Sequence, residues 1–262
     1  MRVQDFYSLT ETDALPWPQM VDLTFVEQTG STNDDLKVFL LNNCLSKPIG
    51  RVALVQNAGR GTRGRSWRST VGGLYFSLAV PFEQIASSLT LIPLSVGLGL
   101  VGALRGKGIH ASLKWPNDLW IKDGKSGGIL CELCKDCTDA KTLIIGVGLN
   151  LSGQNKLTTN GWPISGADEE GRLNTPRLRT ELLAALVWGI FDALSKENES
   201  IIREWPSFDA FNNRTITFES ERECLTGQVL GIDDNGRLLL RIGSETRAFS
   251  SGSISPYDDS FD

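Results

Sequence analysis

The segment from Gly59 to Trp67 contains residue types that could bind an anion. Four arginines stand in or directly after it without an intervening carboxylate, namely Arg60, Arg63, Arg65 and Arg68. Such a cluster repels itself unless an anionic group lies among the guanidinium groups, which bind phosphate and carboxylate in a two-pronged way. Glycines let the backbone approach a ligand closely, and the indole of Trp67 offers a flat face for a ring or a cation. The segment is therefore a candidate anion site, with a solvated surface loop as the alternative.

The pattern G-x-G-x-x-G occurs twice, but neither copy predicts a dinucleotide fold. A dinucleotide fingerprint needs a helix that opens directly after the glycines and an acidic residue about 20 positions further on. After the first copy, Gly59 to Gly64, polar residues follow that do not begin an apolar helix. The second copy, Gly97 to Gly102, lies inside an apolar stretch, and we interpret its small residues as a close contact between helices.

A second group of candidate residues is a polar stretch with two lysines. It comprises Lys114, Trp115, Pro116, Asn117, Asp118 and, further on, Lys125. Pro116 has no amide hydrogen, so it predicts a bulge or an edge position that redirects Asn117 and Asp118. Small residues follow Lys125 and would leave its ammonium group near a ligand oxygen. The alternatives are a structural kink and an ordinary surface lysine.

Hydrophobic periodicity predicts strands and helices over most of the chain. Strands are expected at residues 21–26, 51–56, 74–81, 112–122, 126–134 and 141–151, with a turn at Asp123-Gly124. Helices are expected from the N-cap residues 31–33 to residue 40, at 86–104 and at 177–196, and a loop at 58–65. Three consecutive strands favour a mixed or antiparallel sheet on which the helices pack. The predicted fold class is therefore α+β.

The hydrophobic pattern of the sequence changes beyond Pro206, where short segments of alternating apolar and polar residues replace long periodic ones. Strands are expected there at 215–218, 225–232, 237–242 and 246–249, with Asp234-Asn235-Gly236 as a hairpin turn. We therefore predict three parts of the chain. They are an irregular N-terminal arm at 1–20, a large α+β domain at 21–210 and a small all-β domain at 211–262.

Seven motifs together resemble the biotin-protein ligases, in the order and approximate spacing of that family. They are Ser31-Thr32-Asn33, Gln56, Gly59 to Trp67, Gly72 to Tyr75, Lys114 to Asp118, Lys125 to Glu132 and Gly146 to Asn150. The resemblance implies the class II synthetase-like fold of biotin and lipoate ligases, a mixed β-sheet packed by helices, with a small C-terminal SH3-like β-barrel. It also implies a two-step reaction. Biotin and ATP form biotinyl-5'-AMP, and the biotinyl group then passes to a lysine of a biotin carboxyl carrier protein.

The resemblance also assigns roles to single residues. Biotin contacts match Ser31, Thr32, Asn33, Gln56, Arg60, Gly61, Thr62 and Lys125. Contacts to ATP or the adenylate match Arg63, Arg65, Trp67, Lys114, Asn117 and Asn150. The catalytic positions match Arg60, Lys125, which would touch both the biotin carboxylate and the phosphate, and Asp118, which would accept a proton or a hydrogen bond from the incoming lysine. Mg²⁺ is expected with ATP, and no protein ligand for a metal is predicted.

The sequence departs from the family pattern at two places. Thr62 stands where well-known bacterial members have an arginine, which predicts looser retention of the reactive adenylate. About 20 residues precede Val21, fewer than the winged helix-turn-helix domain of repressor members requires, so regulation at an operator is not expected. The sequence is consistent with a monomer or a homodimer.

Composition limits the other classes of function. A net charge of -5 argues against nucleic acid as the main partner. The chain has no run of about 18 apolar residues and no start typical of a signal peptide, so a cytoplasmic protein without a membrane partner is expected. Five cysteines, an odd number, favour reduced thiols. His110 is the only histidine, which excludes a site built on two imidazoles.

Three other functions remain as alternatives. A lipoate or octanoate ligase resembles this family in fold and chemistry, although the glycine and arginine segment favours biotin. Cys131, Cys134 and Cys137 form C-x-x-C-x-x-C, which would suit a metal or iron–sulfur module, but a fourth nearby ligand is missing. The third alternative is a non-catalytic binding module of the same fold, which activity dependent on Lys125 would exclude.

Overall fold

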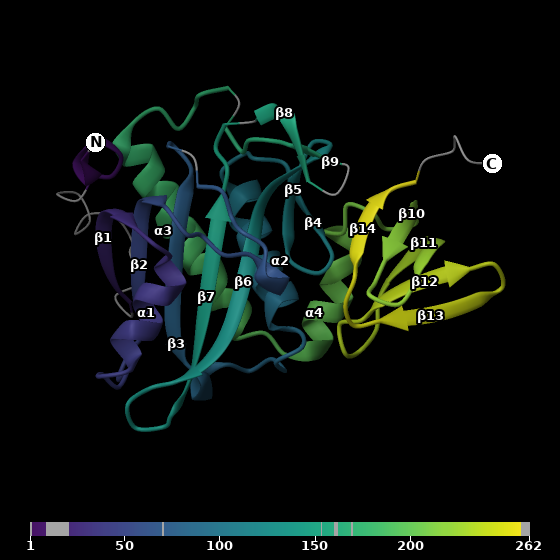
Figure 1. The fold of residues 1–262 in the computed structure, drawn as a ribbon, viewed down its shortest axis with the longest axis horizontal. Coiled ribbons are helices and arrows are strands. Elements are labelled where there is room, and N and C mark those ends of the chain that lie inside the picture. The colour runs from purple at the N-terminus through teal and green to yellow at the C-terminus, as the bar shows by residue number, and fades with distance from the viewer. Residues whose placement is uncertain are drawn as a thin grey trace.

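The computed structural model describes residues 2–8, 21–69, 71–152, 154–159, 162–168 and 170–257. In these ranges the chain forms two β-sheets and the helices that pack on them (Figure 1). The larger sheet has the strand order β1-β2-β3-β7-β6-β5-β4, and β9, which pairs with β8, joins it beside β6. Its strands are β1 (Asp22–Thr29), β2 (Ile49–Gln56), β3 (Leu74–Pro81), β4 (Ala111–Lys114), β5 (Asp118–Ile121), β6 (Gly124–Lys135), β7 (Lys141–Leu149), β8 (Gln154–Thr159) and β9 (Trp162–Ile164).

The larger sheet is mixed, as predicted. β1 and β2 run parallel, whereas the pairs from β2 through β3, β7, β6 and β5 to β4 are antiparallel. β3 is buried along its whole length, because its apolar side chains are covered on both faces of the sheet. The pairing of β6 with β7 brings Gly128 next to Gly148, so two of the sequence motifs lie side by side.

The predicted strand at 112–122 is wrong, because the chain reverses direction in its middle. β4 ends at Lys114 and β5 begins at Asp118, and these two residues form the last pair of an antiparallel ladder. Pro116 lies in the turn between them. A proline cannot donate a ladder hydrogen bond, and a turn accommodates it without loss of pairing. The reversal places Lys114, Asn117 and Asp118 together at one end of the sheet.

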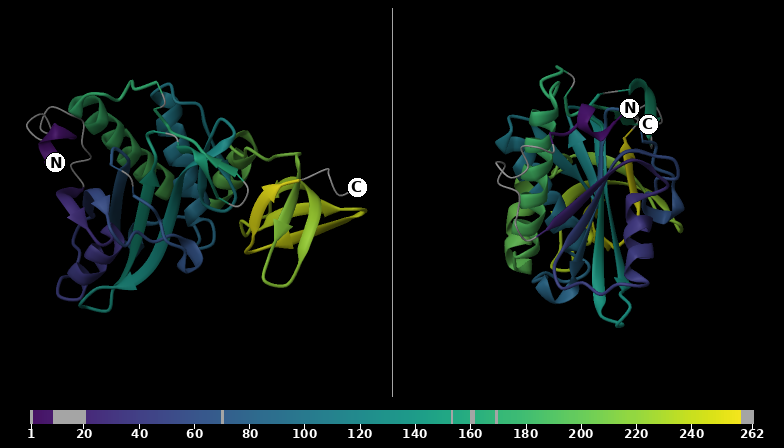
Figure 2. Two further views of the ribbon diagram at one scale, coloured as in Figure 1. Left: turned by 45° about the horizontal axis from the view of Figure 1, so that its top comes forward. Right: turned by 90° about the vertical axis from the view of Figure 1, so that its left-hand side faces the viewer.

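Helices cover both faces of the larger sheet (Figure 2). α1 (Thr32–Leu40) lies on one face, whereas α2 (Ile92–Gly106) and α3 (Pro176–Leu194) pack together on the other. The hydroxyl of Thr175 caps α3 by accepting a hydrogen bond from the backbone N–H of Leu178. The first and third predicted helices are confirmed to within a few residues.

The second predicted helix is shorter than expected, since α2 begins at Ile92 and not at residue 86. Before it the chain makes a turn, in which the backbone N–H of Leu91 donates to the carbonyl of Ser88 at 2.9 Å. Pro93 then occupies the first turn of the helix, where a missing amide hydrogen is not needed. An apolar sequence alone could not separate the turn from the helix.

The two long helices touch backbone to backbone. A Cβ at Gly99 of α2 would collide with the carbonyl oxygen of Gly189 in α3, so this crossing requires glycine. The hydroxyl of Ser95 donates to the carbonyl of Ala193 at 2.7 Å and ties the helices further. The predicted close contact between helices is therefore confirmed at Gly99, whereas a Cβ at Gly97 would meet Leu113 of β4 and one at Gly102 would meet nothing within 4 Å.

The smaller sheet is the predicted C-terminal β domain. Its antiparallel strands follow the order β13-β12-β11-β10-β14. They are β10 (Thr215–Glu219), β11 (Cys224–Ile232), β12 (Leu238–Ile242), β13 (Glu245–Phe249) and β14 (Ser253–Pro256). β14 was not predicted, because serine and proline around Ile254 hide its strand character. Among the described strands β13 and β14 share no ladder, so the sheet is open and not a closed barrel.

Hydrogen bonds from β4 and the turn after it reach the segment that connects the two sheets and the small sheet itself. The connecting segment includes α4 (Asn198–Glu204), which was not predicted. The backbone N–H of Leu113 in β4 donates to the carbonyl of Phe208 at 2.7 Å. The buried indole of Trp115 donates to the carbonyl of Gly236 at 2.9 Å, in the hairpin between β11 and β12. These contacts do not test the predicted domain boundaries, which stay a prediction.

The described part of the N-terminal arm is packed on the large domain. Tyr7 is only 1% exposed, and its ring centroid lies 5.2 Å from that of Phe25. The backbone N–H of Ser8 donates to the hydroxyl of Thr180 in α3 at 2.9 Å. Residues 9–20 of the predicted arm lie outside the described residues. Short 3-10 turns occur at η1 (Val3–Asp5), η2 (Thr62–Gly64), η3 (Phe82–Gln84) and η4 (Trp205–Ser207).

Candidate active site

A cavity of about 470 Å³ brings together the residues that the sequence singled out for chemistry. The segment Gly59–Trp67, named here the glycine–arginine loop, lines one side, and Ser250 to Ser253 of the C-terminal domain line another. The predicted site residues in its lining are Ser31, Thr32, Asn33, Gln56, Arg60, Gly61, Thr62, Arg63, Arg65, Trp67, Lys114, Asn117, Asp118, Lys125 and Asn150. Predicted site residues that are up to 119 positions apart in the chain, Ser31 and Asn150, therefore line one cavity.

The glycine–arginine loop is folded into a short hairpin. The backbone N–H of Trp67 donates to the carbonyl of Gly59 at 2.8 Å, and that of Gly61 donates to the carbonyl of Arg65 at 2.7 Å. A Cβ at Gly59 would lie 2.6 Å from the carbonyl oxygen of Trp67, so this pairing requires glycine. At the tip, Arg63 adopts a left-handed backbone conformation with φ 58°. The segment predicted as a loop thus has a defined backbone beside the cavity.

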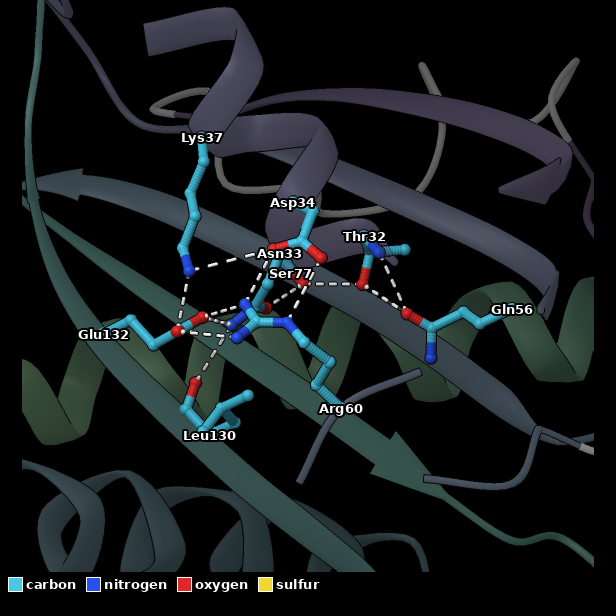
Figure 3. Close-up of polar contacts among 9 residues, drawn as sticks. All are labelled: Thr32, Asn33, Asp34, Lys37, Gln56, Arg60, Ser77, Leu130 and Glu132. Carbon is cyan, nitrogen blue, oxygen red and sulfur yellow. Dashed lines mark hydrogen bonds and ion pairs between the residues drawn. The ribbon is translucent and has the colours of Figure 1, made fainter. Parts of the chain in front are cut away.

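Arg60 is neutralised by two carboxylates from other parts of the chain (Figure 3). Its guanidinium group donates to both oxygens of Glu132 on β6, at 3.1 and 2.7 Å, and pairs with Asp34 on α1 at 2.7 Å. The sequence showed no balancing carboxylate within the loop, because both partners are remote in the chain. Among the described residues no carboxylate pairs with Arg63 or Arg65. The tip of the loop therefore keeps the positive charge that an anionic ligand needs.

Hydrogen bonds fix the N-terminal end of α1 against β3 and β6 (Figure 3). The side-chain amide of Asn33 donates to Glu132 at 2.8 Å and accepts from the hydroxyl of Ser77 at 2.5 Å. Ser77 has only one proton, so Thr32 must donate in the 2.6 Å contact between the two hydroxyls. The backbone N–H of Thr32 donates to Gln56 at 2.9 Å. The proton of the Thr32 hydroxyl is thus used inside the protein, and toward a ligand this oxygen acts as an acceptor.

Trp67 lies on a floor made by two glycines. A Cβ at Gly148 would lie 2.6 Å from the indole, and a Cβ at Gly128 would lie 3.4 Å from it. The ammonium group of Lys125 is 5.8 Å from the ring centroid, within reach of a cation–π contact. The indole N–H is buried and has no hydrogen-bond partner among the described residues. Glycine at 148 is required because a side chain there would displace the ring.

Asp118 is held between two lysines at the end of β5. Its carboxylate oxygens lie 2.9 Å from the ammonium of Lys114 and 2.6 Å from that of Lys125. Burial by itself would raise the pKa of Asp118, but the two neighbouring cations hold it below its ordinary value. Asp118 therefore stays ionised at neutral pH and organises both ammonium groups.

The two asparagines predicted to contact the nucleotide lie on neighbouring parts of the sheet. The side-chain amide of Asn117 donates to the carbonyl of Ile129 in β6 at 2.7 Å, which fixes its orientation. Asn150 follows β7 directly, and its backbone N–H donates to the carbonyl of Ser126 at 2.7 Å. Both residues line the cavity.

Sequence reasoning missed two parts of this site. The first is the wall from the C-terminal domain, where the guanidinium of Arg63 donates to the carbonyl of Gly252 at 3.1 Å. The second is the pair of carboxylates on Arg60. Glu132 belongs to a motif that the sequence displayed, and Asp34 directly follows another, but only their proximity to those motifs hinted at a role.

The C-x-x-C-x-x-C motif does not gather into a metal-binding cluster. Cys131 and Cys134 lie on β6, where positions three apart point to opposite faces. Burial raises the pKa of the Cys131 thiol to about 12, which opposes the thiolate form that binds metals. The pKa of the Cys137 thiol is also raised, first by desolvation and then by the neighbouring Cys44 and Asp136. All five cysteines are described, and no group of three or more His, Cys, Asp or Glu side chains in the described ranges could hold a metal ion.

Known proteins resemble the chain in both domains. Residues 25–150 match the Biotin/lipoate A/B protein ligase family, and residues 212–256 match the Biotin protein ligase C terminal domain. The chain is 32% identical over 213 residues to the bifunctional ligase/repressor BirA of Escherichia coli strain K12. The aligned residues make up 78% of this chain and 65% of that protein. It is 28% identical over 250 residues to the biotin--[acetyl-CoA-carboxylase] ligase of Mycobacterium tuberculosis, which covers 88% of each.

A solved structure shows the same arrangement of elements. The biotin protein ligase from Aquifex aeolicus, in complex with biotin and ATP, matches with a TM-score of 0.74 and 27% identity, over 90% of this chain and 99% of that one. The mixed sheet, the covered cavity and the small β domain define a two-domain ligase fold. The chain therefore carries a catalytic domain of the biotin/lipoate A/B protein ligase family at residues 25–150 and a biotin protein ligase C-terminal domain at residues 212–256. Within the described ranges no helix is long and apolar enough to cross a membrane.

Proposed function

We propose that this protein is an ATP-dependent biotin protein ligase, which forms biotinyl-5'-AMP and transfers biotin to a lysine of a biotin carboxyl carrier protein. One observation carries the proposal. The biotin-matching and nucleotide-matching residues line one cavity, and Lys125 in its wall lies 2.6 Å from the buried carboxylate of Asp118. The relatives named as biotin ligases support the same activity.

The biotin end of the cavity has the polarity that a ureido ring requires. Such a ring presents one carbonyl acceptor and two N–H donors. The hydroxyl of Thr32 acts as an acceptor toward a ligand, because Ser77 takes its proton. Ser31 and Asn33 are buried beside it and supply further polar groups. Lys125 lines the same cavity and is the residue that we expect to contact the biotin carboxylate.

The first step brings two anions together, since the carboxylate of biotin attacks the α-phosphate of ATP and pyrophosphate leaves. Lys125, Arg63 and Arg65 would neutralise the repulsion and stabilise the charge that develops at phosphorus. Arg60 contributes less charge to this step, because Glu132 and Asp34 already pair with it. Mg²⁺ is expected to accompany ATP and to be held largely by its phosphates.

The second step needs the acceptor lysine as a neutral amine in contact with the adenylate. The pKa of Asp118 lies below its ordinary value, so the carboxylate is a weak base at neutral pH. We therefore favour a hydrogen-bond acceptor that orients the amine over a general base. Of the two roles that the resemblance left open for Asp118, the lowered pKa of this carboxyl group and its contacts with Lys114 and Lys125 favour the orienting one.

Biotin-dependent exchange of labelled pyrophosphate into ATP tests the proposal. The wild-type protein is expected to catalyse this exchange with biotin, and lipoate and octanoate in parallel reactions identify a ligase for another acyl group. Lys125→Ala is expected to fold and to lose exchange by several orders of magnitude, whereas Cys134→Ser stays active. Near-normal exchange by the lysine variant would remove the assigned role, and exchange with octanoate but not biotin would replace the substrate.

The other expectations about partners stay proposals. The names of the relatives favour a carboxylase carrier protein as the acceptor. A monomer or a homodimer, a cytoplasmic location and the absence of a nucleic-acid partner stay predictions from the sequence. Sedimentation of the pure protein, with and without biotin and ATP, measures the first of these directly.

A further inference from the structure

Arg60 is anchored more firmly than any other arginine of the glycine–arginine loop. Glu132 accepts two hydrogen bonds from its guanidinium group, at 3.1 and 2.7 Å, and Asp34 accepts one from its Nε at 3.1 Å. These carboxylates come from β6 and α1, on the two sides of the loop (Figure 3). Hydrogen bonds to charged groups are among the stronger ones in proteins, so this contact fixes the loop at that residue.

Glu132 is the hub of the contact. Besides Arg60 it accepts hydrogen bonds from Lys37 at 2.7 Å and from the side-chain amide of Asn33 at 2.8 Å. Burial alone would raise the pKa of Glu132, but hydrogen bonds from Lys37, Asn33 and Arg60 hold it below its ordinary value. Glu132 itself does not line the cavity, whereas Asn33 and Arg60 do. One carboxylate behind the wall therefore orients two residues in the wall.

The position of Arg60 in the hairpin makes this anchor effective. Arg60 pairs with Ser66 across the hairpin, between the backbone hydrogen bonds that join Gly59 to Trp67 and Gly61 to Arg65. Holding Arg60 thus holds both strands of the hairpin, and with them the indole of Trp67 on its glycine floor. In contrast, the tip of the loop is exposed, and in the part of the chain that the structure describes its side chains make one hydrogen bond to the rest of the protein, from Arg63 to the carbonyl of Gly252.

We propose that Glu132, supported by Asp34, is a positioning residue that latches the glycine–arginine loop through Arg60 and so prepares the biotin end of the site. The proposal rests on the proposed function and deepens it. The charge of Arg60 is used in its ion pairs with Glu132 and Asp34. Lys125, Arg63 and Arg65 therefore bind the anionic groups of the substrates. Breaking the latch weakens the binding of biotin and leaves the chemistry at phosphorus largely intact.

The test compares Glu132→Gln and Asp34→Asn with the wild type and with Glu83→Gln, the same exchange at an exposed residue of η3. In biotin-dependent pyrophosphate exchange, Glu132→Gln is expected to raise the KM for biotin about tenfold, as the loss of charged hydrogen bonds predicts, with kcat and the KM for ATP within about threefold. Asp34 is half-exposed, so Asp34→Asn raises the KM for biotin by less, about threefold.

A second readout needs no activity. Trypsin cleaves after Arg63 and Arg65 at the exposed tip, and an unlatched loop is cleaved faster in the free protein. Glu132→Gln is expected to be cut several times faster than Glu83→Gln, and saturating biotin to restore slow cleavage. A role limited to stability would lower the melting temperature and change the KM for biotin and for ATP alike.

The outcomes separate the two proposals. A biotin KM within about twofold of the wild type and an unchanged rate of tryptic cleavage in Glu132→Gln would overturn the latch. If that variant does not fold, Asp34→Asn decides by the same two measurements. A wild-type protein without biotin-dependent exchange would instead refute the proposed function, and the tryptic comparison would still decide whether the latch exists.

Discussion

Replacing Gly148 with alanine is expected to disable the site without unfolding the protein. Gly148 lies on β7 beneath the indole of Trp67, and its α-carbon needs no special backbone conformation there. The three heavy atoms nearest to the added Cβ all belong to the ring of Trp67, the first of them at 2.6 Å. The substitution therefore acts on the position of one aromatic side chain in the cavity.

The size of the effect follows from this distance. Ordinary van der Waals contacts of a Cβ begin at 3.4 Å, so the ring must retreat by about 1 Å. A displacement of about 1 Å in a catalytic site costs on the order of 100-fold in rate. Trp67 is only partly buried on a loop, so the free energy of unfolding is expected to fall by no more than about 1 kcal/mol.

Two measurements check this prediction. The value of kcat/KM for biotin in pyrophosphate exchange is expected to fall about 100-fold, and urea denaturation measures the small loss of stability. Gly102→Ala in α2 is the matched control, because a Cβ there meets nothing within 4 Å and alanine favours a helix by about 0.5–1 kcal/mol. Exchange by Gly148→Ala within about threefold of the wild type would show that the contact of Trp67 with the floor does not matter, and the reasoning would be wrong.

Three further predictions concern single side chains. Asp118→Asn leaves the buried ammonium of Lys114 without its ion pair, so the free energy of unfolding is expected to fall by about 3 kcal/mol in urea denaturation, and an unchanged value would contradict this. Burial raises the pKa of Asp209 from 3.8 to about 6, so the folded state keeps a proton that the unfolded state has lost. Its stability should therefore fall by about 3 kcal/mol as the pH rises from about 4 to about 6, a slope that Asp209→Asn removes. If that variant keeps the slope in denaturation curves, another group is responsible. Thr62→Arg is expected to slow the release of preformed biotinyl-adenylate after rapid dilution, and equal release rates would show that Thr62 does not loosen retention.

The sequence alone predicted the helices and strands whose apolar residues follow one regular spacing over many positions. The apolar spacing of α3 and the continuous apolar run of β3 predicted their elements, because a single buried face or two buried faces leave a regular pattern. It was insufficient at reversals. The residues from Ser112 to Lys122 look like one strand, and only the pairing of Lys114 with Asp118 turns them into a hairpin. The residues just before Ile92 likewise belong to a turn, which the apolar pattern did not separate from the helix that follows.

The site residues were found through seven ordered motifs and not through periodicity. Their types by themselves indicated an anion, and the family resemblance added the nucleotide and the incoming amine. Their contacts were not predictable, because Arg60 looks like an unpaired cation in the sequence and is an ion-paired anchor in the structure. Glu132 lies 72 residues from Arg60 in the chain, and only the packing of β6 beside the loop brings the two together.

The sequence by itself determined the class of fold and the residues that could take part in chemistry, because these depend on residue types, spacing and local order. The tertiary structure decided which charges remain available. Two arginines a few positions apart differ in function because Arg60 is paired with Glu132 and Asp34, whereas Arg63 lies at an exposed tip. The strength of an ion pair depends on the distance between the two charges in space, and the order of the residues in the chain does not give that distance.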